Sequence, residues 1–196
     1  MTLSRRLLAS LAVLLAVGVV VVGGGTYSAF SSSPESNGNS FAAGTVYLSD
    51  NDAGAAMLSL TNAVPGNSDT SCLKVTYAGS LPATVRLYGS SSGALASYLT
   101  LTVTRGTNTA PSFDSCTGFT ADATNYIGAG TGVVYSGSLS AYPTAASPLI
   151  EPTAGAPETW TASEVHSYRF VISLDNNLSA QGQSATASFT WEARNQ

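Results

Sequence analysis

The sequence predicts an all-β protein: a two-sheet antiparallel β-sandwich of about eight strands in a single domain. Apolar and polar residues alternate with a period of two along much of the chain, whereas helical periodicity is scarce. Gly, Pro, Asn and Asp separate the alternating stretches, as turn residues separate strands. The length of 196 residues suits one domain with its own core.

Each expected strand is a cluster of β-branched and aromatic residues between turn-rich segments. The eight strands lie near Thr45–Ser49, Ala55–Leu60, Cys72–Tyr77, Thr84–Tyr88, Leu99–Thr104, Val133–Ser136, Val165–Leu174 and Ala185–Glu192. The stretch from Gly137 to Thr159 is rich in Pro, Ala, Ser and Gly without alternation, so we expect a long surface loop there.

The alternation also predicts which side chains face the core. In one strand Leu99, Leu101 and Val103 face inward, and the intervening threonines face water. The other residues expected inside are Tyr168, Phe170, Ile172, Leu174, Phe189 and Trp191. Their rings would anchor the contact between the sheets.

The chain is weakly charged and acidic, which bears on its partners. Charged residues make up 9% of the sequence. Without Arg5 and Arg6, which lie in the leader described below, five basic and eleven acidic residues remain, a net charge of about −6. Nucleic acid and anionic lipid are therefore poor candidate partners.

Two cysteines and one histidine limit the possible metal and redox chemistry. Cys72 and Cys116 form no CxxC motif, so thiol redox motifs and Cys/His zinc sites are excluded. In an exported protein the default interpretation is one disulfide. It would close a loop of about 45 residues and contribute at most about 4 kcal/mol. Cys72 and Leu73 are neighbours on a predicted strand, so their side chains point to opposite faces. With Leu73 facing the core, the bridge would tie a loop across the outside of the sheet.

Residues 1–28 have the features of an export signal. Arg5 and Arg6 form a charged start, and an almost unbroken apolar run follows from Leu7 to Val22. We expect cleavage between Ser28 and Ala29, which leaves 29–44 as an N-terminal segment and 45–196 as the sandwich domain. In the alternative, an uncleaved leader is the only membrane contact and anchors the domain outside the membrane.

Four motifs resemble a known family. They are Gly23–Phe30 (GGGTYSAF), Asn39–Leu48 (NSFAAGTVYL), Asn62–Asn67 (NAVPGN) and Phe189–Ala193 (FTWEA). They are similar to the leader end, first strand, turn and last strand of the TasA and camelysin group of secreted biofilm-fibre proteins. The resemblance implies a jelly-roll sandwich, a leader cut by a dedicated signal peptidase of the SipW type, and an extracellular or cell-surface location.

The resemblance also implies a mechanism of assembly. The segment Ala29, Phe30, Ser31, Ser32 and Ser33 would leave its own subunit and pair with a sheet edge of the next, Phe30 filling an apolar slot. Head-to-tail addition need not close, so it gives a filament. The expected partners are copies of the same chain or related fibre subunits. The chain is shorter than the fibre-forming members, so a minor subunit or a monomeric surface protein is the other possibility.

No residue set in the sequence is expected to run catalysis or hold a cofactor. The camelysin branch has been described as metallopeptidases, but the zinc motif HExxH does not occur. His166 falls on the same strand face as Tyr168 and Phe170, so we expect it to be structural. Serine is so abundant that one near His166 would be uninformative. A metal held by His166 and two carboxylates would revive the enzyme hypothesis.

Two binding hypotheses remain open. Asp50 and Asp52 alternate as oxygen donors in a calcium loop do, but the spacing to Gly54 is one residue short of an EF-hand and a plain turn is favoured. The runner-up function is a binding module for a glycan or cell-wall ligand, for which an exposed aromatic cluster would be the sign. Tyr47, Tyr126 and Tyr142 are the candidate surface aromatics.

Overall fold

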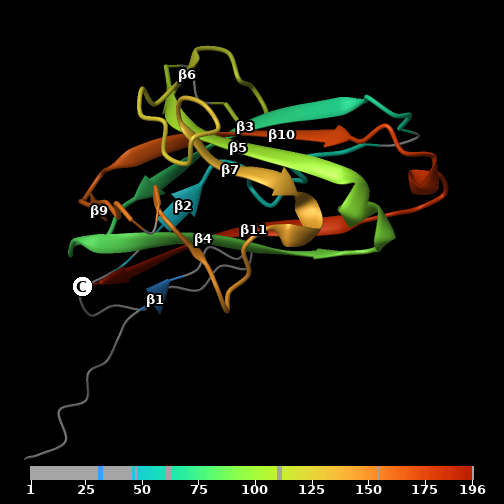
Figure 1. Ribbon diagram of the computed structural model, residues 1–196. Coiled ribbons are helices and arrows are strands. Elements are labelled where there is room, and N and C mark those ends of the chain that lie inside the picture. The colour runs from blue at the N-terminus through green and yellow to red at the C-terminus, as the bar shows by residue number, and fades with distance from the viewer. Residues whose placement is uncertain are drawn as a thin grey trace, which may run out of the picture.

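Two antiparallel β-sheets face each other in the computed structural model of the protein (Figure 1). It describes residues 31–32, 46, 48–60, 63–109, 112–153 and 155–195. The predicted class, an all-β two-sheet sandwich, is confirmed. Within these ranges no helix is long and apolar enough to cross a membrane.

The first sheet has the strand order β1-β11-β4-β8, and β9 also pairs with β4. Its strands are β1 (Ser31–Ser32), β4 (Ala83–Ser92), β8 (Leu149–Ile150), β9 (Thr159–Trp160) and β11 (Thr186–Asn195). The long pair is β4 with β11, in register from Thr186 opposite Ser92 to Asn195 opposite Ala83.

The second sheet has the order β2-β3-β10-β5-β6, and β7 also pairs with β5. Its strands are β2 (Leu48–Asp50), β3 (Ser68–Tyr77), β5 (Leu99–Asn108), β6 (Phe119–Ala121), β7 (Val133–Ser138) and β10 (Val165–Leu174). Short 3-10 helices connect strands: η1 (Ala94–Tyr98), η2 (Leu139–Ala141) and η3 (Leu178–Ala180).

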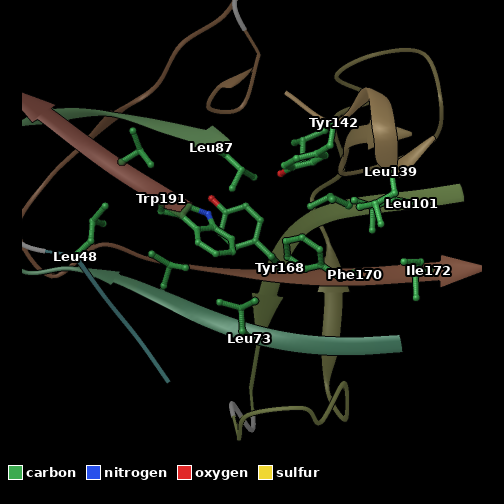
Figure 2. Close-up of a cluster of buried hydrophobic side chains, with 14 of the residues drawn as sticks. Leu48, Leu73, Leu87, Leu101, Leu139, Tyr142, Tyr168, Phe170, Ile172 and Trp191 are labelled. Carbon is green, nitrogen blue, oxygen red and sulfur yellow. The ribbon is translucent and has the colours of Figure 1, made fainter. Parts of the chain in front are cut away.

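The core between the sheets is built from the alternating residues predicted to face inward. Tyr168 and Phe170 of β10 are fully buried, and Trp191 of β11 is 4% exposed. Figure 2 shows these three rings together, with the Tyr168 and Trp191 ring centroids 5.2 Å apart. Phe189 is half-buried and packs on Phe170 at 4.7 Å. Aromatic packing thus joins β10 to β11.

The expected strand at Ala55–Leu60 is wrong. This segment is irregular and lies beside β3, where the Ser59 amide donates to the Asp69 carboxylate at 2.7 Å. Ala53 and Gly54, just before it, both have positive φ and turn the chain. A hydrogen bond to a side chain therefore holds this segment beside β3 where a strand would use main-chain hydrogen bonds. The other expected strands overlap observed ones and β1 falls within the expected donor segment, whereas β6, β8 and β9 were not foreseen.

The expected surface loop from Gly137 to Thr159 is also partly wrong. It contains η2 and β8, and Tyr142 within it is 6% exposed. A Cβ on Gly89 would lie 3.0 Å from the Tyr142 ring, so the missing side chain of Gly89 lets this ring cover β4. Tyr142 is therefore core, and not the surface aromatic predicted. The sequence signal is weak because single apolar residues, without alternation, anchor the segment.

The outer face of the second sheet carries the predicted disulfide. Cys72 and Cys116 are bonded with a Cα–Cα distance of 5.0 Å. The loop that carries Cys116 covers this face: the Asp114 amide donates to the Cys72 carbonyl at 3.0 Å, and the Arg169 guanidinium lies over the Phe119 ring. Cys72 is consequently 1% exposed. The face of β5 that carries the threonines is also less exposed to water than expected, because Thr104 is buried.

Candidate functional site

Arg105 occupies an inward position of β5 that hydrophobic residues hold elsewhere in the strand. It continues the series Leu99, Leu101 and Val103, and it pairs with Tyr168 of β10. The residue is 2% exposed. A guanidinium is charged at any relevant pH, so its burial requires partners of opposite charge or good hydrogen-bond acceptors.

The Arg105 guanidinium is the centre of a polar cluster at one end of the core. It bonds to Glu158 through Nη2, and Nε donates to His166 Nδ1 at 3.2 Å. Its Nε also lies 3.6 Å from an Asp122 oxygen and 3.8 Å from a Glu151 oxygen. These partners come from segments between residues 122 and 166, far from Arg105 in the sequence. One cation thus joins β5 to the segments around β6, β8, β9 and β10.

His166 lies between Arg105 and Glu164 and is held as the neutral ring. Its Nε2 is 2.9 Å from a Glu164 oxygen, and its Nδ1 faces the Arg105 Nε–H. The hydrogen on Nε2 therefore goes to Glu164, and Nδ1 accepts. Burial lowers the pKa of His166, the Arg105 charge lowers it further, and Glu164 opposes both. The ring also packs against Trp160 at a centroid distance of 4.4 Å.

Glu164 is the ionised partner of this histidine. Burial alone would raise its pKa, but the hydrogen bonds from His166 and from Thr161 outweigh burial, so the pKa is lowered. The Thr161 amide donates to the second carboxylate oxygen at 2.7 Å. Both oxygens are thus engaged, one by the ring and one by the turn that joins β9 to β10.

Glu151 is the most deeply buried carboxyl group of the cluster. It is fully buried, and among the described residues neither of its oxygens has a hydrogen-bond partner. The Tyr168 hydroxyl lies near the Glu151 carboxylate and lowers its pKa. Burial raises the pKa of Glu151 to about 7, although the Arg105 charge pulls it down. Glu151 is therefore compensated by the nearby Arg105 charge and not by a hydrogen bond to its oxygens.

Three residues of this cluster could hold a metal ion together. One ligand atom each from Glu158, Glu164 and His166 lies within 4.8 Å of the others. An imidazole nitrogen with two carboxylate oxygens is a donor set that zinc accepts. The set fits a divalent ion in chemistry, while the Arg105 guanidinium stands among the same atoms. The structural role expected for His166 stays a prediction beside this candidate metal site.

The cluster carries excess negative charge. Asp122, Glu158 and Glu164 surround a single guanidinium, with the buried Glu151 beside them. His166 is uncharged there because its pKa is lowered. Among the described residues of this cluster Arg105 is the only cation. A second positive charge would therefore lower the electrostatic free energy of the cluster.

The sheet edge at β11 is the second feature of functional interest. One side of β11 pairs with β4 over ten residues, and the other side pairs with β1 alone among the described strands. In that pairing Ser31 is opposite Arg194 and Ser32 is opposite Ala193. The edge from Thr186 to Glu192 has no strand partner among the described residues. Two residues of the expected donor segment thus lie on an open edge of their own subunit (Figure 1).

The other predicted site residues have these places. Ser28, Ala29, Phe30 and Ser33 lie outside the described residues, so cleavage stays a prediction. Asp50 Oδ1 accepts from the Asp52 amide at 3.4 Å, and Asp52 Oδ1 accepts from the Gly54 amide at 2.7 Å. The two carboxylates thus organise a turn, as the plain interpretation expected, and the calcium role also stays a prediction.

A serine-hydrolase arrangement finds no support in the described residues. Gly89–Gly93 has the G-x-S-x-G spacing, but its central Ser91 donates to the Leu139 carbonyl at 3.3 Å. It also lies toward the far end of β4 from Ala83, which pairs with Trp160 beside His166. The serine and the histidine are therefore separated by most of the length of a strand.

Sequence reasoning missed the cluster around Arg105, although two signals were present. The alternation of β5 runs on to Arg105, and that of β10 begins at His166 before Tyr168. An arginine and a histidine at inward positions on strands require acid partners, which Glu151, Glu158 and Glu164 supply. Their proximity depends on the path of the 137–159 segment, which no local pattern encodes.

Comparison with known proteins places the first part of the chain. Residues 2–91 match the family described as camelysin metallo-endopeptidase. A search of curated proteins finds no match. The matched stretch ends in β4, before Arg105 and every other residue of the polar cluster. The family description therefore says nothing about Glu158, Glu164 or His166 in particular.

Proposed function

We propose that the chain, whose residues 2–91 match the camelysin family, is an exported structural subunit of an extracellular fibre or matrix. After cleavage by a dedicated signal peptidase, Ala29–Ser33 pairs with the β11 edge of a neighbouring subunit. The observation that carries this proposal is the antiparallel pairing of Ser31 and Ser32 with the end of β11.

The pairing supports exchange because the same edge can be filled from within or from outside. Antiparallel main-chain bonds between β1 and β11 are chemically identical whether both strands belong to one chain or to two. The choice depends on the local concentration of the donor and on strain in the segment between donor and domain. Residues 33–44 of that segment are mostly Ser, Asn, Gly and Ala, with Pro34 limiting the length of the donor.

The register assigns a face to each donor residue. Ser32 is opposite Ala193, which is fully buried, and Ser31 is opposite Arg194, which is exposed. Because side chains alternate along a strand, Phe30 in a donated strand of the same register would lie on the Ala193 side. Phe30 is thus the residue expected to contribute apolar contact, while main-chain bonds provide most of the remaining affinity.

The test is assembly of the secreted chain with and without its N-terminal segment. We expect filaments by electron microscopy for the intact chain, and monomers for a variant lacking 29–39. The matched peptide with the sequence of 29–39 should bind the shortened variant at one per subunit, whereas a peptide of the same composition in scrambled order should not. Filaments from the shortened variant, or no binding of the matched peptide, would overturn the proposal.

Peptidase activity is the second candidate, favoured by the convergence of Glu158, Glu164 and His166. A zinc ion bound there would supply Lewis acidity toward a peptide carbonyl. The chain's own residues would hold it, and Arg105 would have to move away. Casein hydrolysis that is lost in Glu158→Gln and kept in Glu192→Gln would support this function, and equal rates in both variants would remove it.

The binding-module hypothesis has no matching observation. The exposed large hydrophobic residues among those described are all aliphatic: Val64, Leu81, Ile127, Val165 and Leu178. Tyr126, one of the candidate surface aromatics, is half-buried and donates its hydroxyl to Asp122 at 2.8 Å. An aromatic platform is therefore not formed by Tyr126 or by the buried Tyr142, and Tyr47 lies outside the described residues.

A further inference from the structure

We propose that the two ends of the sandwich form a direct contact between successive copies of the chain. Val64 and Leu178 of one copy pack against Leu81 and Val165 of the next. The direction of this stacking rests on the proposed function, because the donor strand decides which ends meet. The contact itself rests on where the exposed aliphatic side chains lie.

Connections between the sheets define the two ends. At the Tyr77 end, the turn from Tyr77 to Ala83 leads from β3 to β4. At the other end, named the Leu174 end after the last residue of β10, η1 leads from β4 to β5. The Asp175 amide donates there to the Tyr98 carbonyl of η1 at 2.9 Å. In Figure 1 the C-terminus and the red coil of η3 mark these opposite ends.

The most exposed aliphatic side chains lie at the Leu174 end. Leu178 is 75% exposed and Val64 is 59% exposed. The turn after Val64 is bound to the end of β10, because the Gly66 amide donates to the Leu174 carbonyl at 2.9 Å and the Leu174 amide donates to the Asn67 carbonyl at 2.8 Å. Leu178 begins η3, shortly after Leu174. Both side chains therefore belong to the same end of the sandwich.

Two further exposed aliphatic side chains lie at the Tyr77 end. Leu81 is 42% exposed and Val165 is 41% exposed. The Tyr77 hydroxyl donates to the Leu81 carbonyl. The Tyr77 amide donates at 2.8 Å to the carbonyl of Glu164, the residue before Val165. Leu81 and Val165 thus flank one buried tyrosine, and each end of the sandwich presents a pair of aliphatic side chains.

The distribution of these residues is the evidence, because single exposed aliphatic side chains are common on protein surfaces. Among the described residues, the fifth exposed large hydrophobic side chain, Ile127, lies in the loop between β6 and β7. The outer face of the first sheet carries hydroxyl pairs instead, Ser90 with Ser188 and Ser92 with Thr186. A contact between ends therefore buries aliphatic surface, and a lateral contact through this face does not.

The direction of β1 selects which ends meet. β11 finishes at the Tyr77 end, where Asn195 is opposite Ala83. β1 is antiparallel to β11 and pairs with its last part, so β1 runs toward the Leu174 end of the sheet that it joins. The domain that follows β1 begins at its own Tyr77 end, where Leu48 is opposite Tyr77. A strand donated to a neighbour therefore points toward its own domain when the neighbour's Leu174 end faces the donor's Tyr77 end.

The connecting chain is long enough for this arrangement. Residues 33–47 separate Ser32 from Leu48, and when extended they span about 50 Å at about 3.3 Å per residue. The part of β11 from Ala193 back to Thr186 is about 23 Å long. The segment can therefore pass along the open edge and reach Leu48 across the contact. The two contacts support each other, because the end contact raises the local concentration of the donor beside β11.

The experiment is disulfide cross-linking between copies of the full secreted chain. Leu178→Cys in one preparation and Leu81→Cys in another are mixed at high protein concentration and oxidised. We expect the covalent heterodimer as the main product. Leu178→Cys mixed with Ser90→Cys, at an exposed position on the outer sheet face, is the matched control and should give about tenfold less, because those thiols are not held together. Homodimers of Leu178→Cys as the main product would overturn the stacking.

A charge placed in the contact tests its contribution to assembly. Leu178→Asp should raise the protein concentration needed for filaments by about tenfold or more, because a carboxylate would be buried among aliphatic side chains. Ser90→Asp adds the same charge outside the contact and should assemble as wild type does. Circular dichroism checks that both variants are folded. Equal assembly by Leu178→Asp and Ser90→Asp would overturn the contact.

A second cysteine pair separates this inference from strand exchange. Ser32→Cys mixed with Ala193→Cys reports on the donor strand alone. If that pair forms a heterodimer and Leu178→Cys with Leu81→Cys does not, the end contact is wrong and strand exchange stands. The reverse result keeps the end contact and removes strand exchange, and absence of both heterodimers removes both.

Discussion

Arg105 Nε donates to His166 Nδ1 at 3.2 Å across the paired strands β5 and β10, inside the sandwich. An arginine and a histidine are thus neighbours where the alternation of both strands would place hydrophobic residues. The fold tolerates this because the segments between 122 and 164 bring carboxylates to the same point.

Removing the central cation should destabilise the protein strongly. We expect Arg105→Met to lower the free energy of unfolding by about 3–5 kcal/mol at pH 8, because Glu151 is left buried and unpaired. The loss should be smaller at pH 5, where Glu151, whose pKa is about 7, takes up a proton and loses its charge. Urea denaturation at both pH values measures the difference, and equal stability of variant and wild type at pH 8 would refute it.

The disulfide should contribute a moderate share of stability. The double change Cys72→Ser and Cys116→Ser opens a loop with a sequence separation of 44 residues. We expect a loss of about 2–4 kcal/mol, as for other native bridges. Urea denaturation with and without reductant provides the comparison: reductant should lower the stability of wild type and leave the double variant unchanged.

Ionisation of Asp50 should make the free energy of unfolding depend on pH. Burial, a hydrogen bond with Asp52 and the Asp52 charge raise the pKa of Asp50 to about 6. A raised pKa in the folded state means that ionisation costs stability. The cost is absent below about pH 4, where both folded and unfolded states are protonated. It increases as the pH rises through 6 and is constant above.

Asp50→Asn removes this ionisation. The thermal midpoint of the variant should therefore gain on that of wild type between pH 4 and 7, and the gain should level off above that range. Asp114→Asn, a change at an exposed aspartate of the loop over the second sheet, is the control. A difference between Asp50→Asn and wild type that is constant with pH would count against the assigned shift.

Tyr142 tests the correction made to the 137–159 segment. Its hydroxyl is buried without a hydrogen-bond partner among the described residues, and its ring packs edge-on against Tyr135 and Phe189. Tyr142→Phe should therefore leave stability within about 1 kcal/mol of wild type. Tyr142→Ala should cost about 3–5 kcal/mol through the cavity left behind. If the alanine variant is as stable as wild type, Tyr142 is a surface residue after all.

The sequence predicted the sandwich well because most of its long strands alternate. Burying one face of a sheet fixes which residues point inward. The buried residues are those expected: Leu99, Leu101, Val103, Tyr168, Phe170, Ile172 and Leu174. The disulfide was also predictable, because only two cysteines are present. Short strands such as β8 and β9 were not predictable, as two residues carry no periodicity.

The polar cluster shows what local patterns cannot encode. His166 was placed on the correct face, but its partner Arg105 is 61 residues away on β5, and Glu151 and Glu158 reach that guanidinium from a segment without alternation. Likewise the pairing of Ser31 with Arg194 joins the two ends of the chain. Such contacts depend on the path of loops and on tertiary packing, not on hydrophobic periodicity.

The donor-strand proposal is tested most directly by cross-linking in register. Ser32→Cys in one preparation and Ala193→Cys in another place single thiols on residues that pair in β1 and β11. When the two preparations are mixed under assembly conditions and oxidised, the account predicts a covalent heterodimer in the filaments. Ser32→Cys mixed with Ser188→Cys, on the same edge but out of register, should give little. Filaments in which the Ser32→Cys and Ala193→Cys chains form no covalent heterodimer would contradict donor-strand exchange.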